Sequence, residues 1–496
     1  MNSNYQSYID HLRKLADVMY ASAVLQWDQE TYMPAKGAAI RGQQLATLAG
    51  ISHELSVDPQ FGKLLETLEK DGSLNEKQQR NVKQSLKDYR DRNKYTTAFV
   101  QELTMAVSEA FAAWDEAKSQ NDFSIYQPKL EKIVALKRRE AELLGYSEHP
   151  YDALIDQYEP GTKTSDIDRL FADVKKELKP FIDELLKKKE PREDFMYRNY
   201  STSKQWDLGI ELLKQMGYDF EAGRQDVSSH PFTIHFNAED VRVTTRTNEN
   251  NLHEMIWSTI HEGGHALYEQ GIPLSEYGLP SGEACSLAVH ESQSRLWENI
   301  VGRSLDYWKA NWNLLGAYFA NEMKDVSPEE FYAAMNLVRP SLIRTNADEL
   351  TYHFHILIRF EIEKALMEGS LEVKDLPAAW NKKYKEYLNI DVPSDKEGVL
   401  QDIHWAHGSI GYFPTYSLGS FYSAQLYAAA VKSDAAIPAE IAKGNMKPLL
   451  KWLRENIHVH GKTYAATELI ERATGEKPDF RYFMNYAREK YRGIYS

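Results

Sequence analysis

Residues 251–270 read NLHEMIWSTIHEGGHALYEQ, and this stretch sets the interpretation of the whole chain. Its apolar residues recur three and four positions apart, which predicts a helix. His261 and His265 then lie one turn apart on one helical face, where both imidazoles can bind a single zinc ion. The pattern is HExxH, which is typical of sites that use a metal ion to hydrolyse peptide bonds.

Glu262 lies one position around the helix from His261, so its carboxylate can reach a water on the metal rather than the metal itself. Zinc lowers the pKa of such a water to about 7, and we expect Glu262 to accept its proton as general base. The spacer residues Gly263 and Gly264 each cost about 1 kcal/mol relative to alanine inside a helix. We therefore expect substrate or another backbone to approach closely there. The plainer alternative is two ordinary histidines beside a solvated glutamate.

A catalytic zinc site needs a third protein ligand and one open position. A histidine six residues after His265 is excluded, because Gly271 occupies that position. Residues 281–300 (SGEACSLAVHESQSRLWENI) are predicted to be helical from about Ala284. Glu291 is the carboxylate that a helix–loop–helix return would bring to the metal.

Two other residues of this segment compete with that carboxylate. Glu283 would lie near the helix start, where an acidic side chain is favoured by the helix dipole. His290 could contact a ligand instead of binding the metal. Cys285 is the only cysteine, so a thiolate zinc cluster and an intrachain disulfide are both excluded, and we interpret it as a small buried residue.

The bulk composition narrows the class of protein. Of 496 residues, 42% are hydrophobic, which allows a large core, and the formal charge of −14 opposes binding to nucleic acid or anionic membranes. No stretch approaches the roughly 20 apolar residues of a membrane span. The first 17 residues lack a basic start followed by an apolar run, so we expect no signal peptide. Together these features predict a cytoplasmic protein.

Most of the chain has the periodicity of amphipathic helices, as in residues 5–27, 100–114, 167–186 and 352–367. Residues 232–236 (FTIHF) and 241–245 (VRVTT) instead predict a β-hairpin or two edge strands just before the metal helix. No long linker marks a domain boundary. The sequence thus predicts a mainly α fold, with residues 1–496 as a single catalytic domain and a small sheet beside the metal helix. Two lobes are possible, but no boundary between them can be assigned.

Six motifs in order resemble those of the carboxypeptidase Taq family of metallocarboxypeptidases, and the resemblance covers nearly the whole chain. They are residues 230–232 (HPF), 240–244 (DVRVT), 261–265 (HEGGH), 290–293 (HESQ), 343–348 (IRTNAD) and 398–405 (GVLQDIHW).

The resemblance implies release of single residues from peptide C-termini with broad specificity. It implies a helical fold with a deep groove, like that of neurolysin and angiotensin-converting enzyme, and a homodimer. Zinc is the expected metal, with cobalt able to substitute, and Glu291 becomes the expected third ligand. The expected partners are peptides with a free C-terminus.

A carboxypeptidase must bind a free carboxylate, and arginine suits that task through its planar, bidentate guanidinium. Arg344 is the first candidate, although it could simply pair with Asp348, four residues on. The resemblance favours the functional interpretation. Arg242, in a predicted strand close to the metal helix, is the rival candidate, although Asp240 could neutralise it.

Hydrolysis also needs a donor for the negative charge that develops on the carbonyl oxygen. Residues 405–420 (WAHGSIGYFPTYSLGS) form a glycine- and aromatic-rich segment that is predicted to be a loop. His404, Tyr412 and Tyr416 are the candidates, with Tyr416 ranked above Tyr412 because related folds use a tyrosine in this role. His230 could point toward the substrate or only bond to backbone.

The sequence is compatible with three functions. The first is a zinc carboxypeptidase in which Glu262 activates water and Arg344 holds the C-terminal carboxylate. The second is an endo-acting oligopeptidase with the same metal site. The third is a peptide-binding protein with a structural zinc, for which a free general base beside the metal would have no purpose.

Overall fold

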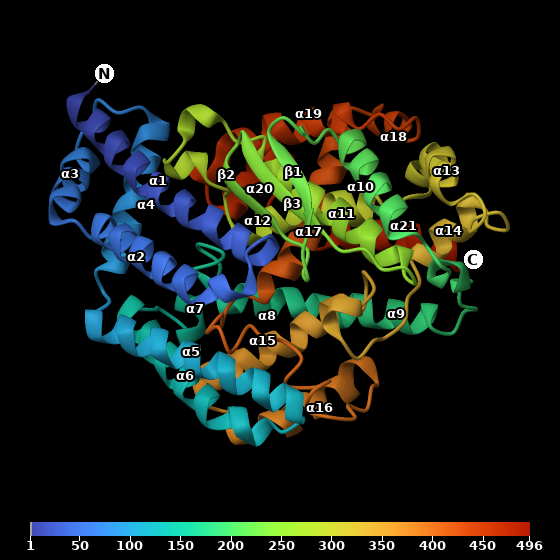
Figure 1. Ribbon diagram of the computed structural model, residues 1–496, viewed down its shortest axis with the longest axis horizontal. Coiled ribbons are helices and arrows are strands. Elements are labelled where there is room, and N and C mark those ends of the chain that lie inside the picture. Colours follow the sequence, from blue (N-terminus) through green and yellow to red (C-terminus); the bar gives the residue numbers. More distant parts are fainter. Residues whose placement is uncertain (1) are drawn as a thin grey trace. The chain divides into compact units, whose positions relative to one another are not determined.

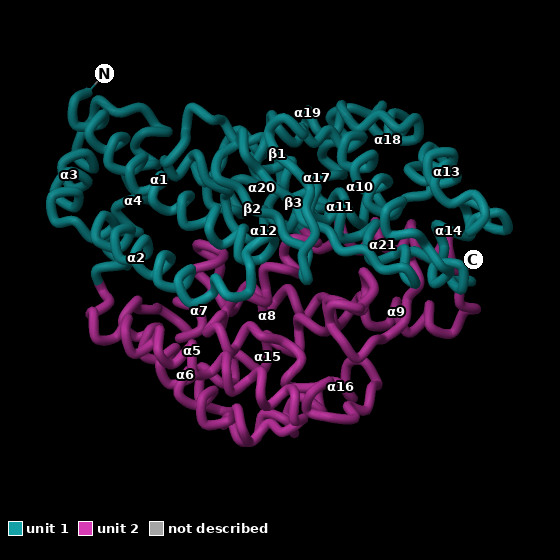
Figure 2. Tube along the Cα trace, in the orientation of Figure 1, with its two compact units in different colours: residues 1–93, 192–335, 422–479 teal, residues 94–191, 336–421, 480–496 magenta. Residues whose placement is uncertain are grey.

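The computed structural model describes residues 2–496, most of which are helical (Figure 1). The chain divides into two compact units (Figure 2). Unit 1 contains Met1–Asn93, Arg192–Met335 and Tyr422–Asp479, and unit 2 contains Lys94–Pro191, Asn336–Phe421 and Phe480–Ser496. Because each unit is assembled from three separate segments, no single linker in the sequence could have shown a boundary.

The prediction of a mainly α fold is confirmed. The helices of unit 1 are α1 (Ser3–Thr31), α2 (Ala38–Ser56), α3 (Pro59–Glu69), α4 (Glu76–Arg92), α10 (Thr202–Met216), α11 (Leu252–Glu269), α12 (Leu287–Arg295), α13 (Leu305–Phe319), α14 (Pro328–Met335), α18 (Ile437–Ile441), α19 (Lys447–Asn456) and α20 (Ala466–Thr474). Those of unit 2 are α5 (Thr97–Gln120), α6 (Phe123–Leu144), α7 (Pro150–Ile155), α8 (Thr164–Asp173), α9 (Lys179–Leu185), α15 (Tyr352–Glu368), α16 (Leu376–Leu388) and α21 (Arg481–Ile494). The remaining long helix is α17 (Pro414–Ser433).

A three-stranded sheet lies in unit 1, with strand order β1-β3-β2. The predicted hairpin is present as β2 (Thr233–Asn237) and β3 (Asp240–Thr245), which pair antiparallel. The sequence analysis missed β1 (Gly223–Val227), which pairs parallel to β3. Its sequence, GRQDV, has neither alternating apolar residues nor β-branched enrichment, so only tertiary pairing makes it a strand.

Helix α11 packs against this sheet and against α10 and α12. Its two central glycines are explained by those contacts. A Cβ on Gly264 would lie 2.7 Å from Ser294 Cα and 2.8 Å from Gln293 O, and one on Gly263 would lie 2.7 Å from Leu213 Cδ2. The sequence suggested that either substrate or another backbone approaches these glycines. At Gly264 it is another backbone, that of α12, which approaches.

Helix α12 begins at Leu287, three residues later than predicted, because the Ser286 hydroxyl caps it by accepting the Val289 N–H. Glu283 therefore lies in extended backbone before the helix and is not a first-turn acid, which corrects the sequence interpretation. Beyond Arg295 the helix continues as a π-helical segment, Leu296–Val301. Such segments are rare and often occur at functional sites.

In unit 2, α15 is buried along most of its length and supplies the core of the unit. Two expectations are corrected here. Arg344 lies in a 3-10 turn (Arg344–Asn346), not on a helix with Asp348 one turn away. Residues 405–420 are only partly a loop, because α17 begins at Pro414 and includes Tyr416.

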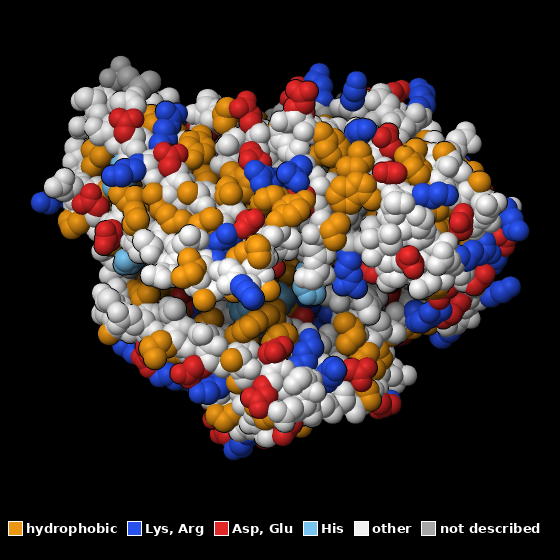
Figure 3. Space-filling view, viewed as in Figure 1, with side chains coloured by type: hydrophobic (Ala, Val, Ile, Leu, Met, Phe, Trp, Pro, Cys, Tyr) orange, Lys and Arg blue, Asp and Glu red, His pale blue; other side chains and the backbone are white. Residues whose placement is uncertain are grey.

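Acidic and basic side chains are interspersed over the face seen in Figure 3, so the net charge of −14 does not gather into one acidic patch there. Within residues 2–496, none of the helices combines the length and apolar character that a bilayer-spanning helix requires.

The α11–α12 contact yields a testable prediction for Gly264→Ala. The new methyl group would meet backbone that cannot rotate away, so we expect a loss of about 1–3 kcal/mol in the free energy of unfolding, measured by urea denaturation. Gly316→Ala in α13 is the control, because a Cβ there meets nothing within 4 Å. That variant should gain up to about 1 kcal/mol from helix propensity. Equal stabilities of the two variants would contradict the proposed close contact.

Candidate active site

Unit 1 contains a group of side chains suited to a metal ion. The Nε2 atoms of His261 and His265 lie 3.7 and 3.4 Å from Glu291 Oε2. These three ligand atoms all lie within 4.8 Å of one another, and the group is the only one of this kind among the described residues. Two imidazole nitrogens and one carboxylate oxygen match the donor set of catalytic zinc sites, so the residues fit the metal that the sequence predicts.

Backbone packing brings the third ligand to the other two. His261 and His265 share one face of α11, with ring centroids 4.9 Å apart. Helix α12 reaches α11 at Gly264, and Glu291 lies two residues before the Gln293 carbonyl that this glycine accommodates. A side chain at position 264 would push α12 outward and move Glu291 away from both imidazoles.

Glu298, which the sequence analysis missed, orients the first histidine. His261 Nδ1 lies 2.8 Å from Glu298 Oε2, an arrangement that leaves Nε2 for the metal. Burial alone would raise the pKa of Glu298, but Arg295 and Arg303 outweigh it and hold that pKa well below its usual range. A signal existed in the sequence, since Glu298 follows Glu291 by seven residues, or about two helical turns. The π-helical segment that sets the direction of the Glu298 side chain could not be predicted from the sequence.

A second chain of contacts orients the other histidine. His265 Nδ1 lies 2.5 Å from His290 Nδ1, and His290 Nε2 lies 2.7 Å from Glu269 Oε1. For His265 to offer Nε2 to a metal, its Nδ1–H must donate to His290, which then donates its own Nε2–H to Glu269. His290 therefore contacts a ligand, one of the roles considered from sequence. Glu269 could have been found, because it lies one turn beyond His265.

The other competitors in this segment lie outside the ligand group. Tyr20 donates its hydroxyl proton to Glu283 Oε1 at 2.7 Å, so this carboxylate belongs to a separate contact. Cys285 is buried, as expected, and its backbone N–H donates to the Tyr268 hydroxyl at 3.0 Å.

Glu262 is 8% exposed and is not part of the ligand group. Its Oε2 accepts a hydrogen bond of 2.7 Å from Thr233 Oγ1 on β2, which fixes the direction of the carboxylate. Burial raises the pKa of Glu262, while His261 and the Thr233 hydrogen bond oppose the rise. A carboxylate with a raised pKa is a better proton acceptor than an exposed one.

The charges of the ligands suit a cation. Burial alone would raise the pKa of Glu291, but Arg295 and the two histidines lower it well below its usual value. Arg295 Nε donates to Glu291 Oε1 at 2.6 Å, so Oε2 remains directed at the histidines. Burial and the neighbouring His290 lower the pKa of His265 to about 3, which keeps this imidazole neutral and able to bind a metal.

A second cluster lies within unit 2, around Arg344, which is only 7% exposed. Its Nε donates to Asp402 Oδ1 and its Nη1 to the Tyr352 hydroxyl, both at 3.0 Å, and its Nη2 has no hydrogen-bond partner among the described residues. Its guanidinium carbon lies 5.2 Å from the ring centroid of Tyr416. Arg359 also pairs with Asp402, so two buried guanidinium groups share one carboxylate. The cluster keeps an excess positive charge.

His404 and Tyr416, both predicted from sequence, are brought together in this cluster. His404 Nε2 lies 3.3 Å from the Tyr416 hydroxyl, and its ring packs against Phe413 in a tilted arrangement with centroids 4.5 Å apart. Burial lowers the pKa of His404 to about 4, although Asp402 opposes the change, so the ring is neutral at pH 7. Tyr412 also lies beside Tyr416, with ring centroids 5.3 Å apart.

The two remaining candidates lie in unit 1. Both hydrogen bonds of the Arg242 guanidinium go to Asp240 at 2.8 Å, and its faces lie over the rings of Trp27 and Phe236. The structure thus shows the Asp240 pairing that the sequence analysis weighed against substrate binding. His230 is exposed just before β2.

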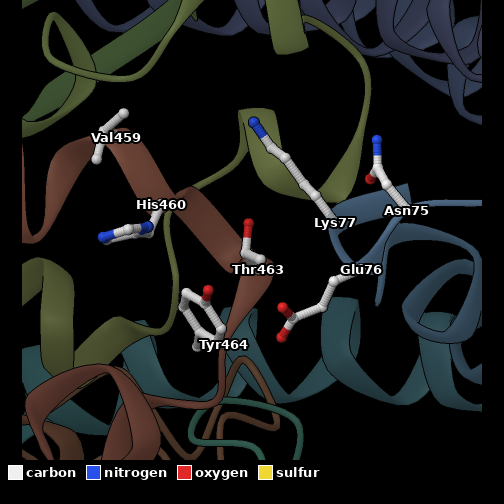
Figure 4. A pocket seen from close by; sticks show the side chains of 7 residues that line it. All are labelled: Asn75, Glu76, Lys77, Val459, His460, Thr463 and Tyr464. Carbon is white, nitrogen blue, oxygen red and sulfur yellow. The ribbon is translucent and has the colours of Figure 1, made fainter. Parts of the chain in front are cut away.

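A surface pocket of unit 1 contains none of the predicted site residues. It is lined by Asn75, Glu76, Lys77, Val459, His460, Thr463 and Tyr464 (Figure 4). Lys77 is paired with Glu276 at 2.7 Å and Glu76 with Arg80 at 3.2 Å. The lysine and the glutamate that line the pocket are therefore already paired.

A mainly helical fold with two histidines, a returning glutamate and a separate buried base defines a metallopeptidase. The sequence pattern of the Carboxypeptidase Taq (M32) metallopeptidases matches residues 7–491. Thermostable carboxypeptidase 1 of Thermus thermophilus is 41% identical, and Carboxypeptidase 1 of Bacillus subtilis is 37% identical; the matches cover 98% or more of each chain. The crystal structure of the M32 carboxypeptidase from Deinococcus radiodurans R1 has a TM-score of 0.98, with 39% identity and full coverage of both chains.

The chain therefore belongs to the carboxypeptidase Taq (M32) family, and it is a metallocarboxypeptidase that acts on peptides. The resemblance stated from its motifs is confirmed. The endo-acting alternative is not favoured, because the relatives that match along the whole chain are named carboxypeptidases.

The contact of Glu298 with His261 predicts the effect of Glu298→Gln. The amide can present its NH₂ group to the histidine, so the ligand loses its fixed tautomer and we expect metal affinity to fall roughly 10- to 100-fold. Competition with a fluorescent chelator measures this loss. Glu283→Gln, which removes a nearby charge that contacts neither histidine ligand, is the control. Equal affinities for the two variants would refute the orienting role of Glu298.

Proposed function

We propose that this chain is a zinc carboxypeptidase that releases single C-terminal residues from peptides with broad specificity. One observation carries the proposal. His261 Nε2, His265 Nε2 and Glu291 Oε2 converge, while the buried carboxylate of Glu262 stays outside that group. A structural metal site would not require such a base.

A divalent cation held by these three residues would polarise the scissile carbonyl and make an attacking water more acidic. Glu262 accepts a proton from that water and then delivers it to the leaving amine nitrogen. Thr233 supports the transfer, because its hydroxyl binds one carboxylate oxygen and fixes the direction of the other. Glu298 and His290 hold the two imidazoles in the tautomers that leave each Nε2 available.

We assign recognition of the substrate carboxylate to Arg344. Its cluster contains two buried guanidinium groups and one shared carboxylate, so an added anion would neutralise the excess charge. Its Nη2 remains available, while Asp402 and Tyr352 hold the rest of the side chain in place. An amidated C-terminus carries no charge and would gain little from this cluster. Arg242 and His230 remain secondary candidates for substrate contacts.

We assign stabilisation of the developing oxyanion to Tyr416 and His404. A hydroxyl or imidazole N–H aimed at the carbonyl oxygen contributes roughly 10²–10³-fold in rate. The neutral state of His404 suits this role, because a neutral ring can donate one N–H without bringing a second full charge to the site. Its Nε2 contact with Tyr416 places both donors beside each other.

The family assignment does not give the natural metal, the oligomeric state or the cellular location. Zinc as the natural metal, with cobalt as a substitute, rests on the histidine and carboxylate donors. A homodimer and a cytoplasmic location remain predictions from the sequence. Light scattering of the purified protein would test the oligomeric state.

Glu262→Gln tests the assignment of the general base. The amide cannot accept the proton, so we expect kcat to fall roughly 10²–10⁴-fold while bound zinc stays near one per chain. Turnover is measured with a defined peptide by chromatography of its products, and zinc is measured on the same sample. The unmodified enzyme treated with a chelator should also lose activity and recover it with zinc. Retained turnover in the variant would refute the role of Glu262.

Arg344→Ala tests the recognition of the C-terminus. We compare kcat/KM for a peptide with a free C-terminus and for the same peptide amidated. Loss of a charged hydrogen bond should reduce the preference for the free acid roughly 10- to 100-fold. Arg139→Ala, which removes an exposed arginine of the same unit, is the control. An unchanged preference in Arg344→Ala would favour an endo-acting peptidase instead.

A further inference from the structure

We propose that Glu363 is a positioning residue that holds His404 in its working orientation by tethering the loop on which His404 lies. The inference rests on the role proposed above for His404. Glu363 belongs to none of the six sequence motifs and contacts none of the residues assigned to the reaction. It is nevertheless a fully buried acid, 0% exposed, and such a residue requires an explanation.

Three donors surround the Glu363 carboxylate. Trp405 Nε1 donates to Oε1 at 2.7 Å, the backbone N–H of Gly411 donates to Oε2 at 2.9 Å, and the Tyr151 hydroxyl also donates to Oε2. Two of these donors lie on the loop between α16 and α17, one directly after His404 and one seven residues after it. The carboxylate therefore closes this loop onto α15 from inside the protein.

The chemistry of the position favours a carboxylate over an amide. Burial raises the pKa of Glu363 to about 7, although the three donors act in the opposite direction. Glutamine would be easier to bury, but only one of its two terminal atoms accepts hydrogen bonds. Donors approach both oxygens of Glu363, so this position needs two acceptors.

Gly411 shows how closely the loop is fitted. Its φ is +98°, and a Cβ there would lie 2.8 Å from the backbone carbonyl of Leu154 on α7. Only glycine both adopts this conformation and lets its N–H reach the carboxylate.

A second tether on the same helix holds the other side of His404. Arg359, one turn before Glu363 on α15, donates its Nε to Asp402 Oδ2 at 2.6 Å and its Nη2 to Gln401 Oε1 at 2.8 Å. The chain is thus fixed to α15 two residues before His404 by a buried guanidinium and one residue after it by a buried carboxyl group.

The imidazole itself makes few polar contacts, and Asp402 Oδ1 lies 4.0 Å from its Nδ1. Its one hydrogen bond is the 3.3 Å contact of Nε2 with Tyr416, and Nδ1 is buried without a hydrogen-bond partner among the described residues. The position of the ring therefore depends on the backbone that carries it and on packing against the rings of Tyr412, Phe413 and Tyr416. Releasing the Trp405 side of the loop should let the ring turn away from Tyr416.

Glu363→Gln and Trp405→Phe test this inference. Glu363→Gln turns an acceptor into a donor, and Trp405→Phe removes the indole N–H that reaches the carboxylate together with part of a buried ring. We expect each to lower kcat roughly 10-fold or more with little change in KM, and to leave bound zinc unchanged. Tyr151→Phe is the matched control, because it removes one hydrogen bond from the same carboxylate but from a donor outside the loop. It should lower the melting temperature through the lost hydrogen bond and leave kcat within about twofold.

A double-mutant cycle separates positioning from general destabilisation. If Glu363 acts through His404, then Glu363→Gln should cause no further loss of kcat in a His404→Asn background. Additive losses would overturn the inference while leaving the role of His404 intact. If His404→Asn alone were without effect, the proposed role of His404 would be wrong and the inference would fall with it. If Tyr151→Phe lowered kcat as much as Trp405→Phe, the effect would be one of stability, and the positioning role would be refuted.

Discussion

The contact between the backbones of α11 and α12 at Gly264 is the constraint on which the proposed metal site depends. Because Gly264 has no Cβ, the Gln293 carbonyl and the Ser294 Cα can lie less than 3 Å from the position that a Cβ would occupy. Glu291 thereby enters the space faced by both imidazoles. Neither helix carries a complete ligand set, so the site exists only because two backbones touch. The cost of placing glycines inside a helix is offset by the ligand that this contact delivers.

Buried charges in both units are arranged so that each has a specific partner. In unit 1, Glu291 and Glu298 are held ionised by Arg295 and Arg303 while their remaining oxygens face the histidines. In unit 2, Asp402 joins Arg344 to Arg359. Breaking one member of such a network leaves an uncompensated charge in a medium of low dielectric constant, which is far more costly than losing an exposed ion pair. The networks therefore fix side-chain direction as well as charge.

Much of the scaffold could be predicted because it depends on local periodicity. The helix of residues 251–270, the long helices of the rest of the chain and the strand pair before the metal helix all follow from the spacing of apolar residues. The elements that were predicted wrongly are those whose bounds are not set by the spacing of apolar residues. Strand β1 forms only by pairing with β3, the start of α12 is set by the Ser286 cap, and α17 begins inside a segment whose glycines and aromatic residues suggested a loop.

The spacing of His261, Glu262 and His265 was enough to predict the chemistry, because two histidines four residues apart on a helix share one face and the glutamate between them lies off that face. It also limited the third ligand to a few residues of one segment. The groups that orient those side chains could be identified only from the folded chain, since Glu298 depends on a π-helical turn and Glu269 on the position of His290. Likewise, nothing in the spacing of Arg344 and Asp348 revealed that the arginine pairs with Asp402, 58 residues away. Residues that act through their neighbours are invisible to sequence patterns, because their partners are chosen by packing and not by position along the chain.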